Sequence, residues 1–334
     1  MSLLGGCETP LREAYDVAVL DLDGVVYRGR EAVPGAPEAL NAAQAAGMHL
    51  AFVTNNASRP PATVGEHLRS LGVEADDADV VNSAQAAARL LAARLEPGSR
   101  VFLIGGEGLE LALRERDLVA VTRVEDDPVA VVQGYGPDLP WKQIMAGATL
   151  VHDGLPWVAS NTDLTIPTAS GVAPGNGALV RLIADFADRE PEVAGKPQKA
   201  LFEETLDRVG GERPLVVGDR LDTDIEGGVA IGWDTLLVLT GVTGLEELVR
   251  ATSACRPTYV APDLACLAEP QPHPELRGDG VVVGGWTATV VDGALQVDGE
   301  GETADWWRAV AEASWAYLDA HDQPVATDGV RPPE

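Results

Sequence analysis

Two acidic side chains stand directly after a short apolar stretch near the start of the sequence. Asp21 and Asp23 follow Val17 to Leu20, and Gly24 comes next. Residues two apart in a strand point to the same side, so both carboxylates can face one crevice. Neighbouring carboxylates repel each other unless a cation lies between them, and oxygen ligands suit a hard ion such as Mg²⁺. The pair indicates a magnesium site or, because Asp and Gly are common in turns, a solvated turn.

A second acidic group follows another apolar stretch, Leu215 to Val217. Asp219, Asp222 and Asp224 lie within the segment that leads into the next expected helix. Asp219 is a further candidate ligand for a cation. Asp224 either supports such a site or caps the helix, and Asp222 is also consistent with a solvated loop charge.

Polar residues suited to anions follow two other expected elements. Thr54, Asn55 and Asn56 come after Leu50 to Val53, and Lys196, one of three lysines in the chain, precedes a helix. A hydroxyl, backbone N–H groups and an ammonium can all hold phosphate oxygens. Each of these two signals is weak alone. In particular, a lysine before a helix is more often solvated than catalytic. Their recurrence after successive strands favours a phosphate site.

The elements that would position these residues alternate between apolar strands and helices. Continuous apolar strands of this kind are typical of a parallel sheet covered on both faces, so the fold class is α/β. Strands are expected at 17–20, 50–53, 101–104, 129–132, 215–217 and 236–239, and helices at 36–46, 61–71, 83–95, 107–115, 176–188, 199–209 and 224–230.

Length and charge limit the function classes. The chain has 334 residues, of which 46% are hydrophobic, enough for two domains with real cores. Its net charge of −28 disfavours nucleic acid and membrane surfaces as partners. No leader-like segment or membrane-spanning apolar run is evident, so we expect a cytoplasmic protein. The three cysteines lack disulfide or metal-site spacing.

The last part of the chain differs in texture. Residues 269–274 are typical of a linker, strands are expected at 281–283, 287–291 and 294–297, and a helix at about 303–320. Four of the seven tryptophans lie here, and Trp307, Ala311 and Trp315 share one helical face. This predicts a small ββα-like appendage that either docks on the main body or forms a subunit contact.

Taken together, these motifs resemble those of the haloacid dehalogenase (HAD) superfamily. Asp21-Leu22-Asp23-Gly24-Val25, Thr54-Asn55-Asn56, Lys196 and Gly218-Asp219 through Asp224 match its four motifs in order. Thr54 follows Asp21 by 33 positions, which leaves no room for a cap domain, whereas Lys196 follows Thr54 by 142 positions, which leaves ample room. That spacing resembles the C2-capped, NagD-like and p-nitrophenylphosphatase-like subgroup.

The resemblance implies an architecture. It consists of a Rossmann-like HAD core with a parallel sheet, an inserted α/β C2-type cap and the C-terminal appendage. The implied ranges are 11–82 for the first part of the core, 83–190 for the cap, 191–268 for the second part of the core, and 271–334 for the appendage.

It also implies a mechanism. Asp21 would be the nucleophile that becomes an aspartyl phosphate, and Asp23 the general acid and base. Thr54, the Asn55 amide and Lys196 would bind the phosphoryl oxygens. The implied magnesium ligands are Asp21, the Asp23 backbone carbonyl and Asp219, with Asp224 acting through the next shell of contacts.

Three residues are candidates for contact with the rest of the substrate. Asn56 follows the second motif, whereas Asn161 and Asp163 lie in the implied cap and are equally consistent with a local Asx turn.

The substrate that the resemblance implies is a small phosphate monoester. In overall texture the sequence resembles actinobacterial members described as glycerol 3-phosphate phosphatases. The alternative substrates are p-nitrophenyl phosphate, phosphoglycolate, and sugar or nucleotide phosphates. The resemblance also implies a homodimer formed through the cap.

Other functions fit less well. A phospho-acceptor or binding module would also use an Asp, a Thr and a Lys around Mg²⁺, but Asp23 favours turnover. A dinucleotide-binding oxidoreductase would need the incomplete glycine pattern at 105–108. A serine hydrolase lacks its GxSxG motif.

Overall fold

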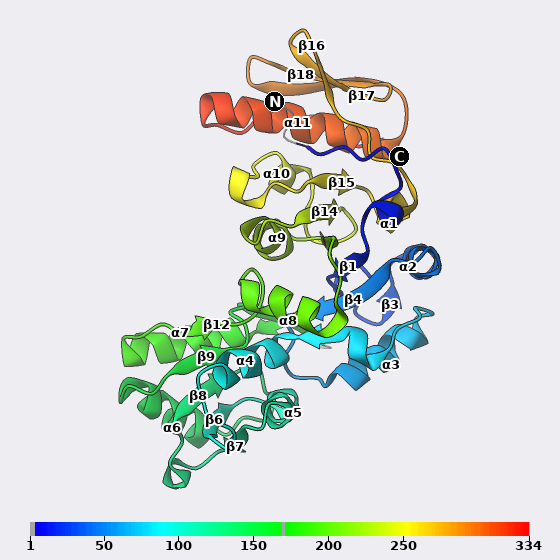
Figure 1. Ribbon diagram of the computed structural model, residues 1–334. Coiled ribbons are helices and arrows are strands. Elements are labelled where there is room, and N and C mark those ends of the chain that lie inside the picture. Colours follow the sequence, from blue (N-terminus) through cyan, green and yellow to red (C-terminus); the bar gives the residue numbers. More distant parts are fainter. Residues whose placement is uncertain (1–3, 169–170, 334) are drawn as a thin grey trace. The chain divides into compact units, whose positions relative to one another are not determined.

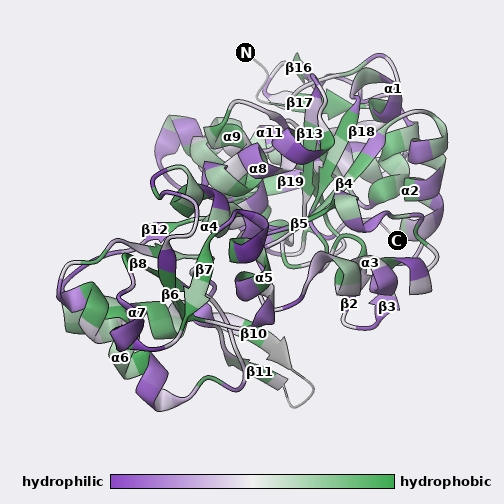
Figure 2. Ribbon diagram, turned by 60° about the horizontal axis from the view of Figure 1, so that its bottom comes forward, coloured by the Kyte–Doolittle hydropathy of each residue, from purple (hydrophilic) through white to green (hydrophobic). Residues whose placement is uncertain are grey.

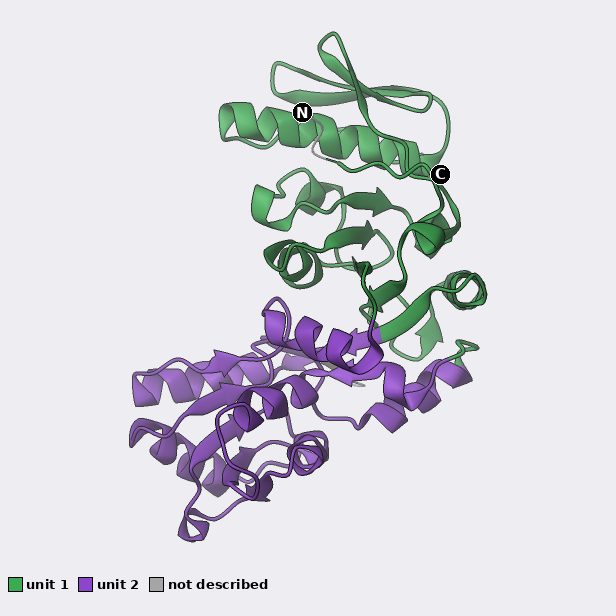
Figure 3. Ribbon diagram, in the orientation of Figure 1, with its two compact units in different colours: residues 1–51, 71–74, 211–334 green, residues 52–70, 75–210 purple. Residues whose placement is uncertain are grey.

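The computed structural model describes residues 4–168 and 171–333. Contacts divide the chain into two compact units (Figure 3). Unit 1 contains residues 1–51, 71–74 and 211–334, and unit 2 contains residues 52–70 and 75–210. Each unit is built around parallel strands, which confirms the α/β class (Figure 1). The units group 52–70 and 191–210 with the predicted cap, so the core and cap limits given above stay a prediction.

Unit 1 contains a parallel sheet in the order β15 (Tyr259–Ala261), β14 (Asp234–Val238), β13 (Pro214–Gly218) and β1 (Val17–Leu20), followed by the start of β4 (His49–Thr54). All four residues of β1 are buried, as expected for a strand covered on both faces. The other elements here are α1 (Leu11–Ala14), β2 (Tyr27–Arg28), β3 (Glu31–Ala32), α2 (Ala36–Ala45), α9 (Glu226–Ala230) and α10 (Leu245–Leu248).

The end of β4, from Phe52 onward, belongs to unit 2, where it pairs in parallel with β5 (Val80–Asn82). A second parallel sheet has the order β12 (Glu192–Val193), β9 (Trp157–Ala159), β8 (Ala130–Gln133), β6 (Arg100–Ile104) and β7 (Val119–Val121). An antiparallel hairpin consists of β10 (Thr165–Thr168) and β11 (Gly171–Pro174). The helices are α3 (Pro61–Ser70), α4 (Ser83–Ala92), α5 (Glu107–Glu115), α6 (Trp141–His152), α7 (Asn176–Ala187) and α8 (Lys199–Val209).

Strands β6, β8 and β9 of unit 2 are apolar, and helices α6 and α7 add apolar residues to their core (Figure 2). Buried residues of this core include Phe102 on β6, Ile144 on α6 and Ile183 on α7. Sequence patterning missed α6, whose apolar positions are interrupted by polar and small residues. Among the residues that the structure describes, no helix is both long and apolar enough to cross a bilayer.

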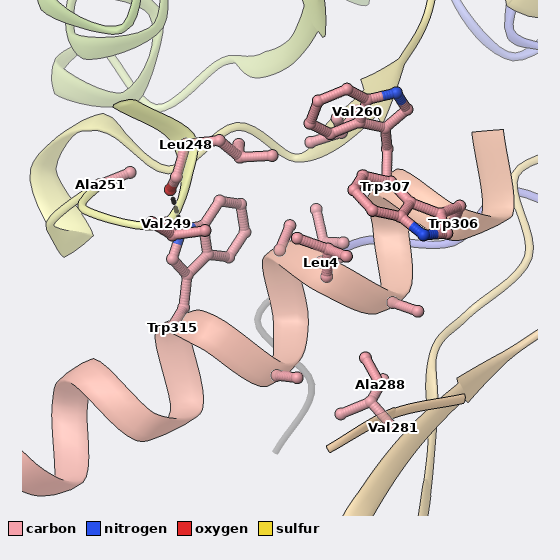
Figure 4. Close-up of a cluster of buried hydrophobic side chains, with 14 of the residues drawn as sticks. Leu4, Leu248, Val249, Ala251, Val260, Val281, Ala288, Trp306, Trp307 and Trp315 are labelled. Carbon is pink, nitrogen blue, oxygen red and sulfur yellow. Dashed lines mark hydrogen bonds between the residues drawn. The ribbon is translucent and has the colours of Figure 1, made fainter. Parts of the chain in front are cut away.

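The C-terminal segment forms an antiparallel sheet of β16 (Glu275–Arg277), β17 (Gly280–Val283), β18 (Trp286–Val291) and β19 (Ala294–Gly299), followed by α11 (Thr303–His321). Trp306, Trp307 and Trp315 of α11 are buried in the core of unit 1 (Figure 4). The Trp315 indole N–H donates to the Leu248 carbonyl at 2.7 Å. The docking alternative for the appendage is therefore confirmed.

The predicted linker at 269–274 lies within the described residues and contains no helix or strand, but one of its residues is anchored in unit 1. Gln271 is 2% exposed, and its backbone exchanges two 2.7 Å hydrogen bonds with Cys7. Its side chain accepts from Arg308 of α11 at 2.5 Å. Both the Nε2 and the Oε1 of this glutamine therefore have hydrogen-bond partners within the linker's surroundings.

Candidate active site

Asp21 lies immediately beyond β1, held beside β13. Its backbone N–H donates to the Val217 carbonyl at 2.9 Å, and its side chain is half-buried. The chain then turns: Gly24 has a φ of +87° and its N–H donates to the Tyr27 carbonyl at 2.8 Å. A Cβ at Gly24 would collide with the Asp219 carboxylate. The turn therefore requires glycine for its conformation and for the acid's close approach. The carboxylate of Asp23 is exposed.

Asp219 follows β13 and is 1% exposed. Its Oδ2 accepts from the Val242 N–H at 2.7 Å, and its carbonyl accepts from the Thr243 N–H at 3.1 Å. A Cβ at Gly241 would overlap the same carboxylate. Sequence analysis missed the 240–244 segment, although its two glycines within five residues after a strand were a signal of a tight loop.

Asp224 lies in a π-helical turn, Leu221–Ile225, and is 1% exposed. Its Oδ2 accepts from the Arg220 N–H at 3.2 Å. The following helix α9 begins at Glu226 with Ile225 as its N-cap, so the alternative of Asp224 as a helix cap is wrong. The helix predicted at 224–230 starts later because the wider turn occupies its first residues. Asp222 is exposed and pairs with Arg220 at 2.8 Å, which confirms the solvated alternative for it.

Three of these carboxylates gather into one group. Asp21, Asp219 and Asp224 each offer an oxygen, and the three oxygens lie within 4.8 Å of one another. Like charges this close in a largely buried place favour a cation, and an all-oxygen donor set fits a hard divalent ion. The residues present therefore fit Mg²⁺. Asp23, by contrast, is exposed.

In unit 2, the residues after β4 form a turn. Thr54 is 8% exposed, and its Oγ1 accepts from the Asn56 N–H at 3.1 Å. The Asn56 Oδ1 accepts from both the N–H and the hydroxyl of Ser58, at 3.0 and 2.7 Å. Asn56 thus shapes the turn that presents Thr54, and its predicted contact with substrate stays a prediction.

Lys196 is not a solvated lysine, since it is only 5% exposed. Its backbone N–H donates to the Asn55 Oδ1 at 2.8 Å, and its carbonyl accepts from the Asn55 Nδ2 at 3.1 Å. The side chain of Asn55 is therefore engaged with the lysine's backbone, which leaves the Asn55 backbone N–H as the group predicted to meet phosphate.

The two predicted cap residues form the Asx turn that was the alternative for them. The Asn161 Oδ1 accepts from the Asp163 N–H at 3.2 Å. Asn161 is 4% exposed and its Nδ2 donates to the Asn55 carbonyl at 2.6 Å, whereas Asp163 is half-buried and its Oδ1 accepts from the Asn55 Nδ2 at 3.2 Å. The structure thus joins Asn161, Asp163, Asn55 and Lys196 in unit 2.

Family models match two ranges of the chain that contain these residues. A family model described as haloacid dehalogenase-like hydrolase matches residues 18–119, and one described as HAD-hydrolase-like matches residues 193–267. The matches include Asp21, Thr54, Lys196 and Asp219. The chain belongs to the haloacid dehalogenase-like hydrolases.

Individual relatives place it among phosphatases of that family. It is 40% identical to a D-glycerol 3-phosphate phosphatase of Mycobacterium tuberculosis, over 94% of this chain and 90% of that protein. Crystal structures of a glycerol phosphate phosphatase from the same organism, with calcium and with magnesium, match with a TM-score of 0.86, at 40% and 39% identity, over 95% of this chain and 94% of theirs.

Two shorter relatives lack a counterpart for a quarter of the chain. An acid sugar phosphatase of Staphylococcus aureus is 32% identical over 75% of this chain and 95% of its own length. A p-nitrophenyl phosphatase from Archaeoglobus fulgidus is 31% identical, with a TM-score of 0.70, over 76% of this chain and 98% of its own. These relatives confirm the predicted NagD-like and p-nitrophenylphosphatase-like resemblance.

Proposed function

We propose that this protein is a magnesium-dependent phosphatase that hydrolyses a small phosphate monoester through an aspartyl phosphate. The observation that carries the proposal is the group of three carboxylates from Asp21, Asp219 and Asp224, two of them 1% exposed. Asp21, Asp219 and the Asp23 carbonyl would hold Mg²⁺ directly. Asp224 would act indirectly, through contacts with these ligands. When bound, the ion supplies positive charge that offsets the carboxylates and an incoming phosphate.

Asp21 would attack the phosphorus atom. A carboxylate oxygen forms the new O–P bond while the ester O–P bond breaks, which leaves an aspartyl phosphate. The hydrogen bond from its N–H to Val217 fixes the backbone of Asp21 at the end of β1, so the nucleophile sits on a rigid element.

Asp23 would move the protons. In the first step its carboxyl group protonates the departing alkoxide, and in the second its carboxylate takes a proton from the water that attacks the aspartyl phosphate. The products are an alcohol, inorganic phosphate and regenerated Asp21. The exposure of the Asp23 side chain supports this role, because a proton shuttle needs access to water.

Thr54, the backbone amide of Asn55 and Lys196 would bind the phosphoryl oxygens. Phosphoryl transfer depends mainly on positioning and on neutralising charge at those oxygens. A buried ammonium supports this assignment, since Lys196 is 5% exposed in a chain of net charge −28. Local positive charge is needed to hold an anionic substrate against such a field.

The substrate we propose is glycerol 3-phosphate. Its support is the similarity to the mycobacterial D-glycerol 3-phosphate phosphatase, which extends over 94% of this chain, compared with 75% for the acid sugar phosphatase. A sugar phosphate is the second candidate, because that relative is also 32% identical.

We further propose that the protein acts in the cytoplasm on a small metabolite, without nucleic acid or membrane partners, as its net charge supports. A second copy of the chain is the proposed protein partner. Apolar side chains on α6 and α7 support it: Trp141 and Met145 are 60% and 55% exposed, and Phe186 is 56% exposed.

The test is phosphate release from glycerol 3-phosphate, glucose 6-phosphate and p-nitrophenyl phosphate, with Mg²⁺ or with EDTA. We expect Mg²⁺-dependent release with the highest kcat/KM for glycerol 3-phosphate. Asp21→Asn should lower kcat by about 10⁴-fold or more, as losses of catalytic nucleophiles do. Asp222→Asn is the matched control, because that acid is exposed and paired with Arg220.

Each arm can contradict a different part of the proposal. Unchanged turnover in Asp21→Asn would exclude the aspartyl-phosphate mechanism. Equal rates in EDTA would exclude the metal, and a higher kcat/KM for the sugar phosphate would replace glycerol 3-phosphate with the second candidate.

A further inference from the structure

We infer that the side chain of Asn55 is a positioning residue for Lys196, and that buried amides extending into the predicted cap hold it in place. The inference rests on the proposed role of Lys196 in binding phosphoryl oxygens. It assigns to Asn55 a function through its side chain, in addition to the backbone N–H predicted to meet phosphate.

The first step is the contact between the two residues, which are 141 positions apart in the sequence. The Asn55 Oδ1 accepts from the Lys196 N–H at 2.8 Å, and its Nδ2 donates to the Lys196 carbonyl at 3.1 Å. The carboxamide thus pairs with the peptide groups on both sides of the lysine Cα, as a neighbouring strand would. Two opposed hydrogen bonds fix both the place and the orientation of that Cα.

The second step is the packing around this pair. A Cβ placed on Gly195 would lie 2.6 Å from the Asn55 Oδ1 and 2.7 Å from the Ser160 carbonyl. Real Cβ atoms do not approach oxygen so closely, so the residue before Lys196 must be glycine. The loop is therefore pressed against Asn55, and the lysine backbone has little room to shift.

The third step is what holds Asn55 itself. Its carbonyl accepts from the Ser83 hydroxyl and from the Asn161 Nδ2, both at 2.6 Å. The Asn161 carbonyl accepts from the Asn176 Nδ2 at 2.7 Å, and the Asn176 Oδ1 accepts from the Gln133 Nε2 at 3.3 Å. Contacts thus run from the end of β8 through the start of α7 and the turn after β9 to Asn55.

The burial of these amides makes each contact matter. Asn55, Asn161, Asn176 and Gln133 are 9%, 4%, 3% and 0% exposed. A buried polar group that loses its partner cannot form a replacement hydrogen bond with water, and this destabilises the fold. Such a network therefore either stays intact or rearranges. Changes in the predicted cap can therefore reach Lys196 through side chains alone.

The substitution that isolates this role is Asn55→Asp, because it keeps the shape and the acceptor for the Lys196 N–H. It removes the donor to the Lys196 carbonyl and places a second carboxylate beside Asp163, whose Oδ1 is 3.2 Å from the lost Nδ2. Repulsion on both sides should displace the lysine backbone. Misplacing a binding group by about 1 Å can cost about 100-fold.

The measurement is the inhibition constant of inorganic phosphate, together with kcat, KM and the melting temperature. We expect Asn55→Asp to raise the inhibition constant about 10- to 100-fold. Asn176→Asp, two contacts further away, should raise it less. The control is Gln271→Glu, since Gln271 is 2% exposed and donates to two carbonyls in unit 1. It should lower the melting temperature and leave the inhibition constant unchanged.

A double variant separates this inference from the proposed function. Lys196→Ala alone should weaken phosphate inhibition, and adding Asn55→Asp to it should change nothing further, because Asn55 acts through the lysine. If Lys196→Ala has no effect, the proposed role of the lysine fails. If Lys196→Ala weakens inhibition but Asn55→Asp alone does not, or if the two effects multiply, the positioning role is overturned.

Discussion

Two of the places where the described residues bury carboxylates differ in the charge of the neighbouring groups. Glu204 on α8 is fully buried in unit 2, and Asp219 and Asp224 are 1% exposed in unit 1. Glu204 is surrounded by arginines, whereas the two aspartates share their surroundings with the carboxylate of Asp21. Burial of the acid is common to both, so the charge of the neighbours is what separates them.

The chain itself neutralises Glu204. Arg116 donates to both of its carboxylate oxygens at 2.8 Å, and Arg208 donates to Oε1 at 2.6 Å. Arg89 adds a third guanidinium at 3.8 Å. Burial works to lower the pKa of Arg208, yet the hydrogen bond that it donates to Glu204 raises that pKa above its ordinary value. Such a group is complete without a ligand and ties α4, the end of α5 and α8 together.

The aspartates of unit 1 have a different need. Three carboxylates within 4.8 Å of one another concentrate negative charge, and two backbone N–H groups, from Val242 and Arg220, offset only part of it. A buried acid whose neighbours are bases therefore belongs to the scaffold, and one whose neighbours are acids is suited to an external cation.

The strongest test of the scaffold side is Glu204→Gln. Removing one partner of a buried ion pair leaves the arginines uncompensated, so the free energy of unfolding should fall by about 3–5 kcal/mol. Urea unfolding measures this loss. The matched control is Glu203→Gln, one residue away on α8, whose side chain is 44% exposed and which should cost less than about 1 kcal/mol. Equal losses in both variants would remove the distinction between the two acids.

This contrast also marks how far the sequence could predict the site. Asp21, Asp219 and Asp224 were found because they follow apolar strands, and parallel strands bring their ends to one edge of a sheet. Glu204 stands mid-helix and carries no such signal, since its three arginines come from residues 89, 116 and 208. Charge neutralisation across that distance is a property of tertiary packing.

The same limit applies to the other elements. Strand β1 and helices α5 and α8 begin and end where the periodicity predicted, at 17–20, 107–115 and 199–209. The π-helical turn Leu221–Ile225 was missed, and its last two residues were assigned to the helix that follows it. The pairing of Asn55 with Lys196 was also missed, since a carboxamide in sequence does not reveal whether its side chain or its backbone meets a ligand.

Binding of Mg²⁺ by the group of Asp21, Asp219 and Asp224 should have a smaller effect on stability than the loss of Glu204. Binding of Mg²⁺ to the folded protein alone should raise the free energy of unfolding by about 2.7 kcal/mol at 100 times its dissociation constant. Asp219→Asn should abolish this gain at the same Mg²⁺ concentration, because it removes a proposed ligand. Glu204→Gln and Asp222→Asn should keep it. Thermal unfolding with Mg²⁺ and with EDTA measures the gain, and a wild-type curve that ignores Mg²⁺ would contradict the assignment.

The ion pair between Arg256 and Asp319 should contribute least to the free energy of unfolding, because water reaches it. The Arg256 side chain is 7% exposed and lies over Trp315, but the Asp319 side chain is 51% exposed. The hydrogen bond from Arg256 lowers the pKa of Asp319, so its contribution to stability is present at pH 7 and is lost as pH falls through that lowered pKa.

At pH 7, Asp319→Asn should therefore reduce the free energy of unfolding by at most about 1 kcal/mol, as exposed pairs do. Salt should shrink this loss, because the Debye length falls from about 10 Å at 0.1 M to about 3 Å at 1 M. The loss in Glu204→Gln should change less over the same range, since the Glu204 side chain is 0% exposed and salt screens buried charges less. Urea unfolding of both variants at the two salt concentrations compares them directly. A salt dependence as large for Glu204 as for Asp319 would mean that solvent ions screen the buried acid as well, and burial would then no longer separate scaffold acids from exposed ones.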